Sequence, residues 1–176
     1  MLHRFYFLLL LLCMAGLPLC GMAQIQSVHI GVNGLTCSQC TRNVEMSLRK
    51  LPFVQDVKMN LEHTDGVITL KPKIIFNPRA IAKAVKDAGF SLRFFTATLD
   101  FTRLSTDEPC FEIYGDSYNL MGQKVVPQQP EVVQFIDDGF MPAAALKKWR
   151  PLMIPTCQPV PISNEYFITL VKGKLK

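Results

Sequence analysis

Between residues 25 and 51 the spacing of hydrophobic positions changes from a strand period to a helix period. Apolar and polar residues alternate over 25–32, as in a strand with one buried face, and Asn33-Gly34 ends the alternation. Three apolar residues then recur at i, i+4 and i+7, the spacing of one helical stripe: Val44, Leu48 and Leu51. The pattern therefore predicts a strand followed by a helix that begins near Cys40 and stops at Pro52.

The next stretch has the pattern of a β-hairpin. Val57, Met59 and Leu61 alternate with polar residues, which predicts a strand that carries these three side chains on one face. Residues 63–66, His-Thr-Asp-Gly, have turn chemistry, and residues 67–70 supply the returning strand.

A second helix and a further strand complete this part of the pattern. Asn77 is a capping residue followed by Pro78 at the first helical position, and Gly89 is a frequent helix terminator. Residues 92–101 then alternate as a strand. The order strand, helix, strand, strand, helix, strand predicts an α+β fold over residues 24–101: the ferredoxin-like βαββαβ sandwich, with two helices on one face of the sheet.

Residues 102–176 have a different pattern of apolar and turn-forming residues. This pattern predicts a small β-rich extension with one short helix. Residues 104–109 are expected to be a connector and 155–161 a proline-rich coil. Strands are expected at 111–114, 132–136 and 166–172, and a helix at 142–149. An open barrel is one arrangement that such strands could adopt.

Residues 1–23 have the order of a secretory signal. A basic start precedes the apolar run 5–12, and Gly21-Met22-Ala23 offers small residues for cleavage after Ala23. The apolar run is shorter than the roughly 20 residues that a membrane-spanning helix needs. The sequence therefore predicts an exported protein with no stable membrane span after cleavage. An uncleaved anchor and a lipoprotein acylated at Cys20 remain as alternatives.

Loss of the signal would leave four of the six cysteines, in two pairs. Cys37 and Cys40 are expected at the junction of the first strand and helix. The helix N-terminus favours a thiolate there, and thiolates select soft ions. A structural zinc site needs four protein ligands, and no second CxxC completes one. Two sulfurs suit Cu(I) or Hg(II), which accept near-linear coordination, and leave room for a thiolate from a partner.

Other roles remain open for these cysteines. Cys37 and Cys40 could form an inert disulfide or a thioredoxin-like pair that exchanges disulfides, although Ser38-Gln39 is unlike the usual spacer of such pairs. Cys110 and Cys157 would enclose a loop of nearly fifty residues, and a disulfide is expected there in an exported protein. A second metal site or two free thiols are the alternatives.

The loop Gly34-Leu35-Thr36-Cys37-Ser38-Gln39-Cys40, in this order of elements, resembles the heavy-metal-associated domain family, which includes copper chaperones and periplasmic mercury-binding proteins. The resemblance covers about residues 25–99. It implies that Cys37 and Cys40 are the metal ligands. Leu35 replaces a family methionine that packs beneath the loop, and Phe90 would shield the site as in bacterial members. It further implies a periplasmic location and a partner such as a metal-transporting ATPase, an efflux system or another metal-binding protein.

Composition, charge and the motifs that are missing exclude several classes of function. Hydrophobic residues make up 49% and charged residues 19%, which is typical of a folded chain. The net charge of +5 is scattered along the chain, so nucleic acid is not an expected partner. No Ser-His-Asp set, paired carboxylates or glycine-rich phosphate loop is found, and an enzyme is therefore not expected. Trp149 is expected to anchor the packing of the short helix.

Overall fold

A computed structural model describes residues 25–72, 74–104, 108–155, 157 and 164–171. The signal expected at residues 1–23, with Cys20, lies outside these residues, as does most of the expected proline-rich coil. Within the described residues, no helix is long and apolar enough to cross a membrane.

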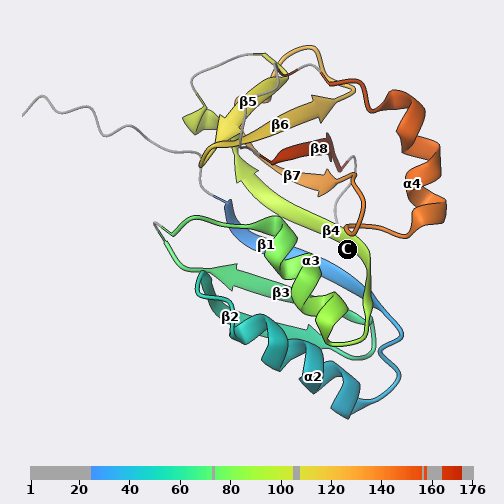
Figure 1. Ribbon diagram of the computed structural model, residues 1–176. Coiled ribbons are helices and arrows are strands. Elements are labelled where there is room, and N and C mark those ends of the chain that lie inside the picture. The colour runs from blue at the N-terminus through green and yellow to red at the C-terminus, as the bar shows by residue number, and fades with distance from the viewer. Residues whose placement is uncertain (1–24, 73, 105–107, 156, 158–163, 172–176) are drawn as a thin grey trace, which may run out of the picture.

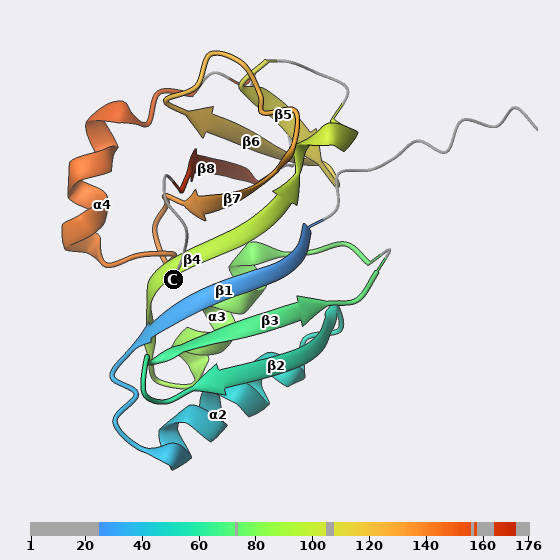
Figure 2. The same cartoon turned by 180° about the vertical axis from the view of Figure 1, so that it is seen from behind.

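The first half of the described chain has the expected order of elements. These are β1 (Ile25–Asn33), α2 (Ser38–Arg49), β2 (Val54–Asn60), β3 (Asp65–Leu70), α3 (Pro78–Asp87) and β4 (Ser91–Asp100). The four strands are all antiparallel in the order β2-β3-β1-β4. Figures 1 and 2 show α2 and α3 against the same face of these strands. The predicted α+β fold with a ferredoxin-like βαββαβ sandwich is confirmed.

Local signals explain where most of these elements begin. The Asn77 side chain accepts a hydrogen bond from the Ala80 backbone N–H at 3.1 Å, as expected of a capping residue before Pro78. The prediction for β2 was wrong at its end. The Asn60 side chain accepts a hydrogen bond from His63 N–H, which starts the turn early, and Leu61 is 41% exposed instead of facing the core.

The second half adds strands to the same sheet. Its elements are η1 (Phe101–Arg103), β5 (Cys110–Ile113), β6 (Asp116–Met121), β7 (Pro130–Phe135), α4 (Ala143–Trp149), η2 (Arg150–Leu152) and β8 (Glu165–Leu170). Strand β7 pairs antiparallel with β4, and the full order is β2-β3-β1-β4-β7-β8-β6-β5. The extension is therefore a continuation of the first sheet, and the open barrel considered from the sequence is not what forms.

Strand β6 was missed by the sequence pattern, which gave no strand between 114 and 132. The turn before it lies at Tyr114 and Gly115, which both have positive φ, and the strand begins at Asp116. The next four residues are all buried, including the polar Ser117 and Asn119. Burial on both faces removes the alternation of polar and apolar residues by which a strand is recognised.

The hydrophobic core crosses the junction between the two halves. Phe95 of β4 is fully buried and contacts Phe135 and Phe140 of the second half, with ring centroids 4.8 and 4.9 Å apart. A smaller cluster consists of Ile136, Met141, Leu146 and Phe167, with Trp149 packed against it as expected. Helix α4 covers this smaller cluster, away from α2 and α3 (Figure 1).

Candidate metal centre

Cys37 and Cys40 lie where β1 turns into α2. Gly34 leaves the strand with φ +86°, a left-handed conformation that favours glycine, and the chain then turns inward. Leu35 is 3% exposed and belongs to the main core, beneath the loop. Cys37 is the N-cap of α2 with extended backbone angles, and Cys40 lies in the first helical turn. The helix thus begins two residues earlier than the sequence pattern indicated.

Hydrogen bonds hold Cys37 against the start of the helix. Its Sγ accepts a hydrogen bond from the Cys40 backbone N–H at 3.2 Å. Its carbonyl oxygen accepts two more from Thr41, one from the backbone N–H at 3.1 Å and one from Oγ1 at 3.2 Å. The sulfur therefore occupies the position of a capping side-chain oxygen, at the positive end of the helix.

The same contacts give the two thiols different pKa values. Hydrogen bonds from the side chain and backbone of Cys40 hold the pKa of Cys37 below its usual value. Donation of the Cys40 side chain to Cys37, together with partial burial, raises the pKa of Cys40. Both cysteines are free, Cys37 is exposed and Cys40 is half-buried. Cys37 is thus the thiol that ionises first, and it faces solvent.

Phe90 lies beside this loop, as the sequence comparison led us to expect. Its ring carbon Cδ1 is 3.6 Å from the point where a Cβ on Gly34 would stand. A cavity of about 600 Å³ borders the other side of Phe90. Lys83 and Lys86 of α3 line it, and so do residues 138, 139 and 141–143 of the second half. The extension therefore lines the same hollow as Phe90, whose ring lies beside Gly34.

The second pair of cysteines is in a different state. Cys110 and Cys157 form a disulfide, with their Cα atoms 5.1 Å apart and a separation of 47 positions in sequence. Cys157 is buried, and its backbone N–H donates to Asn119 Oδ1 at 3.1 Å. These sulfurs are therefore not available to a metal ion. No group of three or more His, Cys, Asp or Glu side chains could hold a metal ion within the described residues.

Two residues with clear roles near the cysteines were not found by sequence reasoning. Thr41 fixes the Cys37 carbonyl, and its i+4 position relative to Cys37 is a local signal that could have identified it. Asn119 holds the backbone at Cys157 across 38 residues, and no local pattern indicates such a contact.

Comparison with known proteins agrees with this geometry. Residues 30–91, which include both cysteines, match the model of the heavy-metal-associated domain. Human copper-transporting ATPase 2 is 38% identical over 114 residues, which are 61% of this chain and 8% of the ATPase. Copper-transporting ATPase 1 of Rhizobium meliloti (strain 1021) is 36% identical over 65 residues, or 37% of this chain and 8% of that protein. This chain thus corresponds to a small fraction of the length of either relative.

Among solved structures, oxidized MerP from Ralstonia metallidurans CH34 is 29% identical to this chain, with a TM-score of 0.35. The alignment covers 40% of this chain and 96% of MerP. The family match at the sequence level and the paired thiols at the strand-to-helix bend point to the same assignment. Residues 30–91 of this chain are a heavy-metal-associated domain.

Proposed function

We propose that this chain is an exported carrier that binds a soft metal ion through Cys37 and Cys40 and passes it to another protein. Cu(I) is the expected cargo, and Hg(II) is the alternative. The observation that carries the proposal is the state of the two thiols. Both are free at one helix N-terminus, and the exposed Cys37 has the lowered pKa.

The arrangement suits capture and release more than permanent retention. Cys37 presents to solvent the thiol of lower pKa, which ionises first, and Cys40 supplies a second sulfur from the first turn of the helix. Soft ions prefer such ligands over oxygen. Two sulfurs leave the coordination of Cu(I) open, so a thiolate of an acceptor joins before the carrier's own sulfurs leave. The protein acts here as a carrier and catalyses no reaction.

The partner we propose is a metal-transporting ATPase, an efflux system or another protein with a metal-binding thiol pair. Support comes from relatives that are copper-transporting ATPases. Export is proposed from the signal pattern and is supported by the Cys110–Cys157 disulfide, because such bridges persist in oxidising compartments.

Cu(I) competition tests this function directly. The chain from residue 24 is reduced at its CxxC pair and titrated without oxygen against a Cu(I) chelator. Wild type should withdraw one Cu(I) per chain, and Cys37→Ser/Cys40→Ser should withdraw none. The matched control Ser38→Ala/Gln39→Ala changes the two residues between the cysteines and should bind as wild type. Equal Cu(I) retention by wild type and the double serine variant would refute the proposal.

Thiol–disulfide exchange is the second candidate, because one exposed thiol of low pKa beside one of raised pKa also suits that chemistry. Reduction of a model disulfide by the dithiol form separates the two functions. A carrier should reduce it no faster than a small free thiol at equal concentration, whereas an exchanger should be markedly faster.

A further inference from the structure

The segment 147–154 comprises the end of α4, the short helix η2 and the first residues of the following coil. It exposes large apolar side chains. Leu152 is 62% exposed and Ile154 is 70% exposed. They flank Met153, which packs against the smaller core cluster as Trp149 does, so these two residues attach the segment to the fold. Two exposed aliphatic side chains alone do not make an interaction site, so the case for one depends on the charges and the hollow beside them.

Positive charge accompanies these apolar side chains. Lys147, Lys148 and Arg150 are all exposed. None of the three takes part in the ion pairs found among the described residues. The sequence has no Asp or Glu from residue 139 to 164, so the charge of the segment is not neutralised along the chain. The segment therefore combines three cations with two protruding aliphatic residues.

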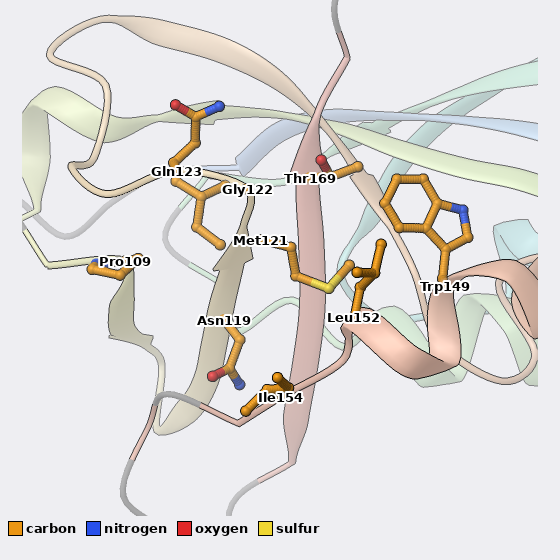
Figure 3. Close-up of a pocket in the computed structure, with 10 residues that line it drawn as sticks. Pro109, Asn119, Met121, Gly122, Gln123, Trp149, Leu152, Ile154 and Thr169 are labelled. Carbon is orange, nitrogen blue, oxygen red and sulfur yellow. The ribbon is translucent and has the colours of Figure 1, made fainter.

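A hollow lies between this segment and strands β6 and β8 of the sheet. It has a volume of about 310 Å³, and its lining includes Met121 of β6 and Thr169 of β8. Figure 3 shows Trp149, Leu152 and Ile154 around it, on the side of α4 and the following coil. No acidic side chain lines the hollow. Leu152 and Ile154 thus border open space, and Trp149, which also packs against the smaller core cluster, lines the same hollow.

We propose that the segment 147–154 is a membrane-docking surface that binds the headgroup region of an anionic lipid bilayer. Lysine and arginine near an anionic surface are attracted to it, tryptophan favours the interface, and aliphatic side chains gain by entering the acyl boundary. The segment is too short to span a bilayer, so the contact is peripheral. It would hold the extension, and the metal-binding domain attached to it, at the membrane surface.

The lone tryptophan of the chain makes this proposal directly measurable. Trp149 belongs to the segment, and the chain has no other tryptophan. The chain from residue 24 is used, because the apolar run 5–12 would itself bind lipid. It is mixed with phosphatidylcholine vesicles that contain or lack phosphatidylglycerol, and with vesicles that carry brominated acyl chains. With anionic vesicles, Trp149 emission should shift to shorter wavelength and brominated lipid should quench it. Neutral vesicles should leave the emission unchanged.

Two variants test the two kinds of contact. Lys147→Glu/Lys148→Glu should weaken partition by at least about thirtyfold, since each cation near an anionic surface contributes about fivefold. Leu152→Ser/Ile154→Ser should weaken it by about tenfold or more, because less apolar surface enters the bilayer. Two matched controls change residues of the first half of the chain. Ile74→Ser/Ile75→Ser lies between β3 and α3, and Lys50→Glu/Lys58→Glu changes the C-cap of α2 and a residue of β2. Figure 1 shows α2 and β2 away from α4.

The controls should bind vesicles within about twofold of wild type, since no lipid contact of the proposed surface is changed. Absence of a spectral shift with anionic vesicles would overturn the proposal and leave an acidic protein as the partner of this surface. Equal binding by wild type and both segment variants would overturn it as well, and so would equal binding to neutral vesicles. None of these measurements involves a metal ion, so their outcome is separate from that of the proposed carrier function.

Discussion

The two halves of the sheet each contain a pair of cysteines, and the pairs are in opposite chemical states. Cys37 and Cys40 are free at a solvent-facing bend, where the helix N-terminus stabilises a thiolate. Cys110 and Cys157 are joined, and Cys157 is buried behind β6 residues that hold its backbone. One protein therefore holds one cysteine pair as free thiols at a helix start and the other pair as a crosslink.

The halves also differ in how they are supported. Two amphipathic helices cover the strands of the first half, whereas the second half has one short helix and a disulfide. The two nevertheless share one sheet and one main core through the β4–β7 pairing. The comparison therefore predicts that the halves unfold together, although their cysteines perform separate tasks.

Phe95→Ala should have the largest effect, because the Phe95 ring contacts aromatic residues of the second half. Loss of such a fully buried ring costs about 3 to 5 kcal/mol. Denaturant unfolding should be followed by far-UV circular dichroism and by Trp149 fluorescence, which reports on the second half. Both signals should shift to the same lower midpoint. A Trp149 transition that keeps the wild-type midpoint would show that the second half folds independently.

Removal of the crosslink should separate stability from metal binding. Cys110→Ala/Cys157→Ala should lower the free energy of unfolding by about 2 to 4 kcal/mol, because the unfolded chain regains the freedom of a long loop. Cu(I) affinity measured by chelator competition should remain as in wild type. A loss of Cu(I) capacity in this variant would mean that the second pair takes part in metal binding.

Arg79 of α3 connects the halves through side chains, with a smaller expected effect. Its Nη2 is 2.9 Å from Asp137 Oδ2, and its guanidinium lies 5.2 Å from the ring centre of Tyr166. Arg79→Met should cost about 1 kcal/mol in unfolding free energy, since the pair is partly exposed. Lys83→Met, which removes only an ion pair within α3, is the matched control and should cost less. An effect no larger than that of the control would show that Arg79 does not couple the halves.

The smallest expected effect concerns the rates at which the free thiols react. Because its pKa is lowered from 9.0, Cys37 stays ionised at pH values where an ordinary cysteine is protonated. Cys40, whose pKa is raised, becomes ionised only at higher pH. Alkylation by iodoacetamide, followed by peptide mass spectrometry from pH 6 to 10, should therefore give Cys37 the lower midpoint. The same midpoint for both cysteines would contradict the hydrogen-bonding arrangement at the helix start.

Sequence reasoning was accurate in the first half because its signals are local. Capping at Asn77, the stripe of α2 and the spacing of Cys37 and Cys40 each lie within a few residues of the feature that they indicate. In the second half the structure depends on distant contacts. Strand β6 pairs in parallel with β8, about 48 residues later, and is buried on both faces, so neither its period nor its partner is evident from neighbouring residues.

At the candidate site too, features set by local sequence were predicted and features set by distant contacts were not. The two cysteines and the positions of Leu35 and Phe90 were anticipated from the motif. The hollow that residues 138, 139 and 141–143 form beside Phe90 was not, because it exists only once the β4–β7 pairing brings the extension against α3. The free state of one pair and the crosslinked state of the other likewise depend on which backbone groups surround each sulfur.

The decisive measurement is the number of alkylated cysteines, determined by mass spectrometry before and after metal addition. It shows whether Cys37 and Cys40 alone hold the metal ion. The folded chain from residue 24, reduced only at accessible sites, should accept two alkyl groups, at Cys37 and Cys40. After one equivalent of Cu(I) both should be protected while the Cys110–Cys157 crosslink stays closed. Four alkylated cysteines without metal, or two that remain fully reactive with Cu(I), would contradict the account.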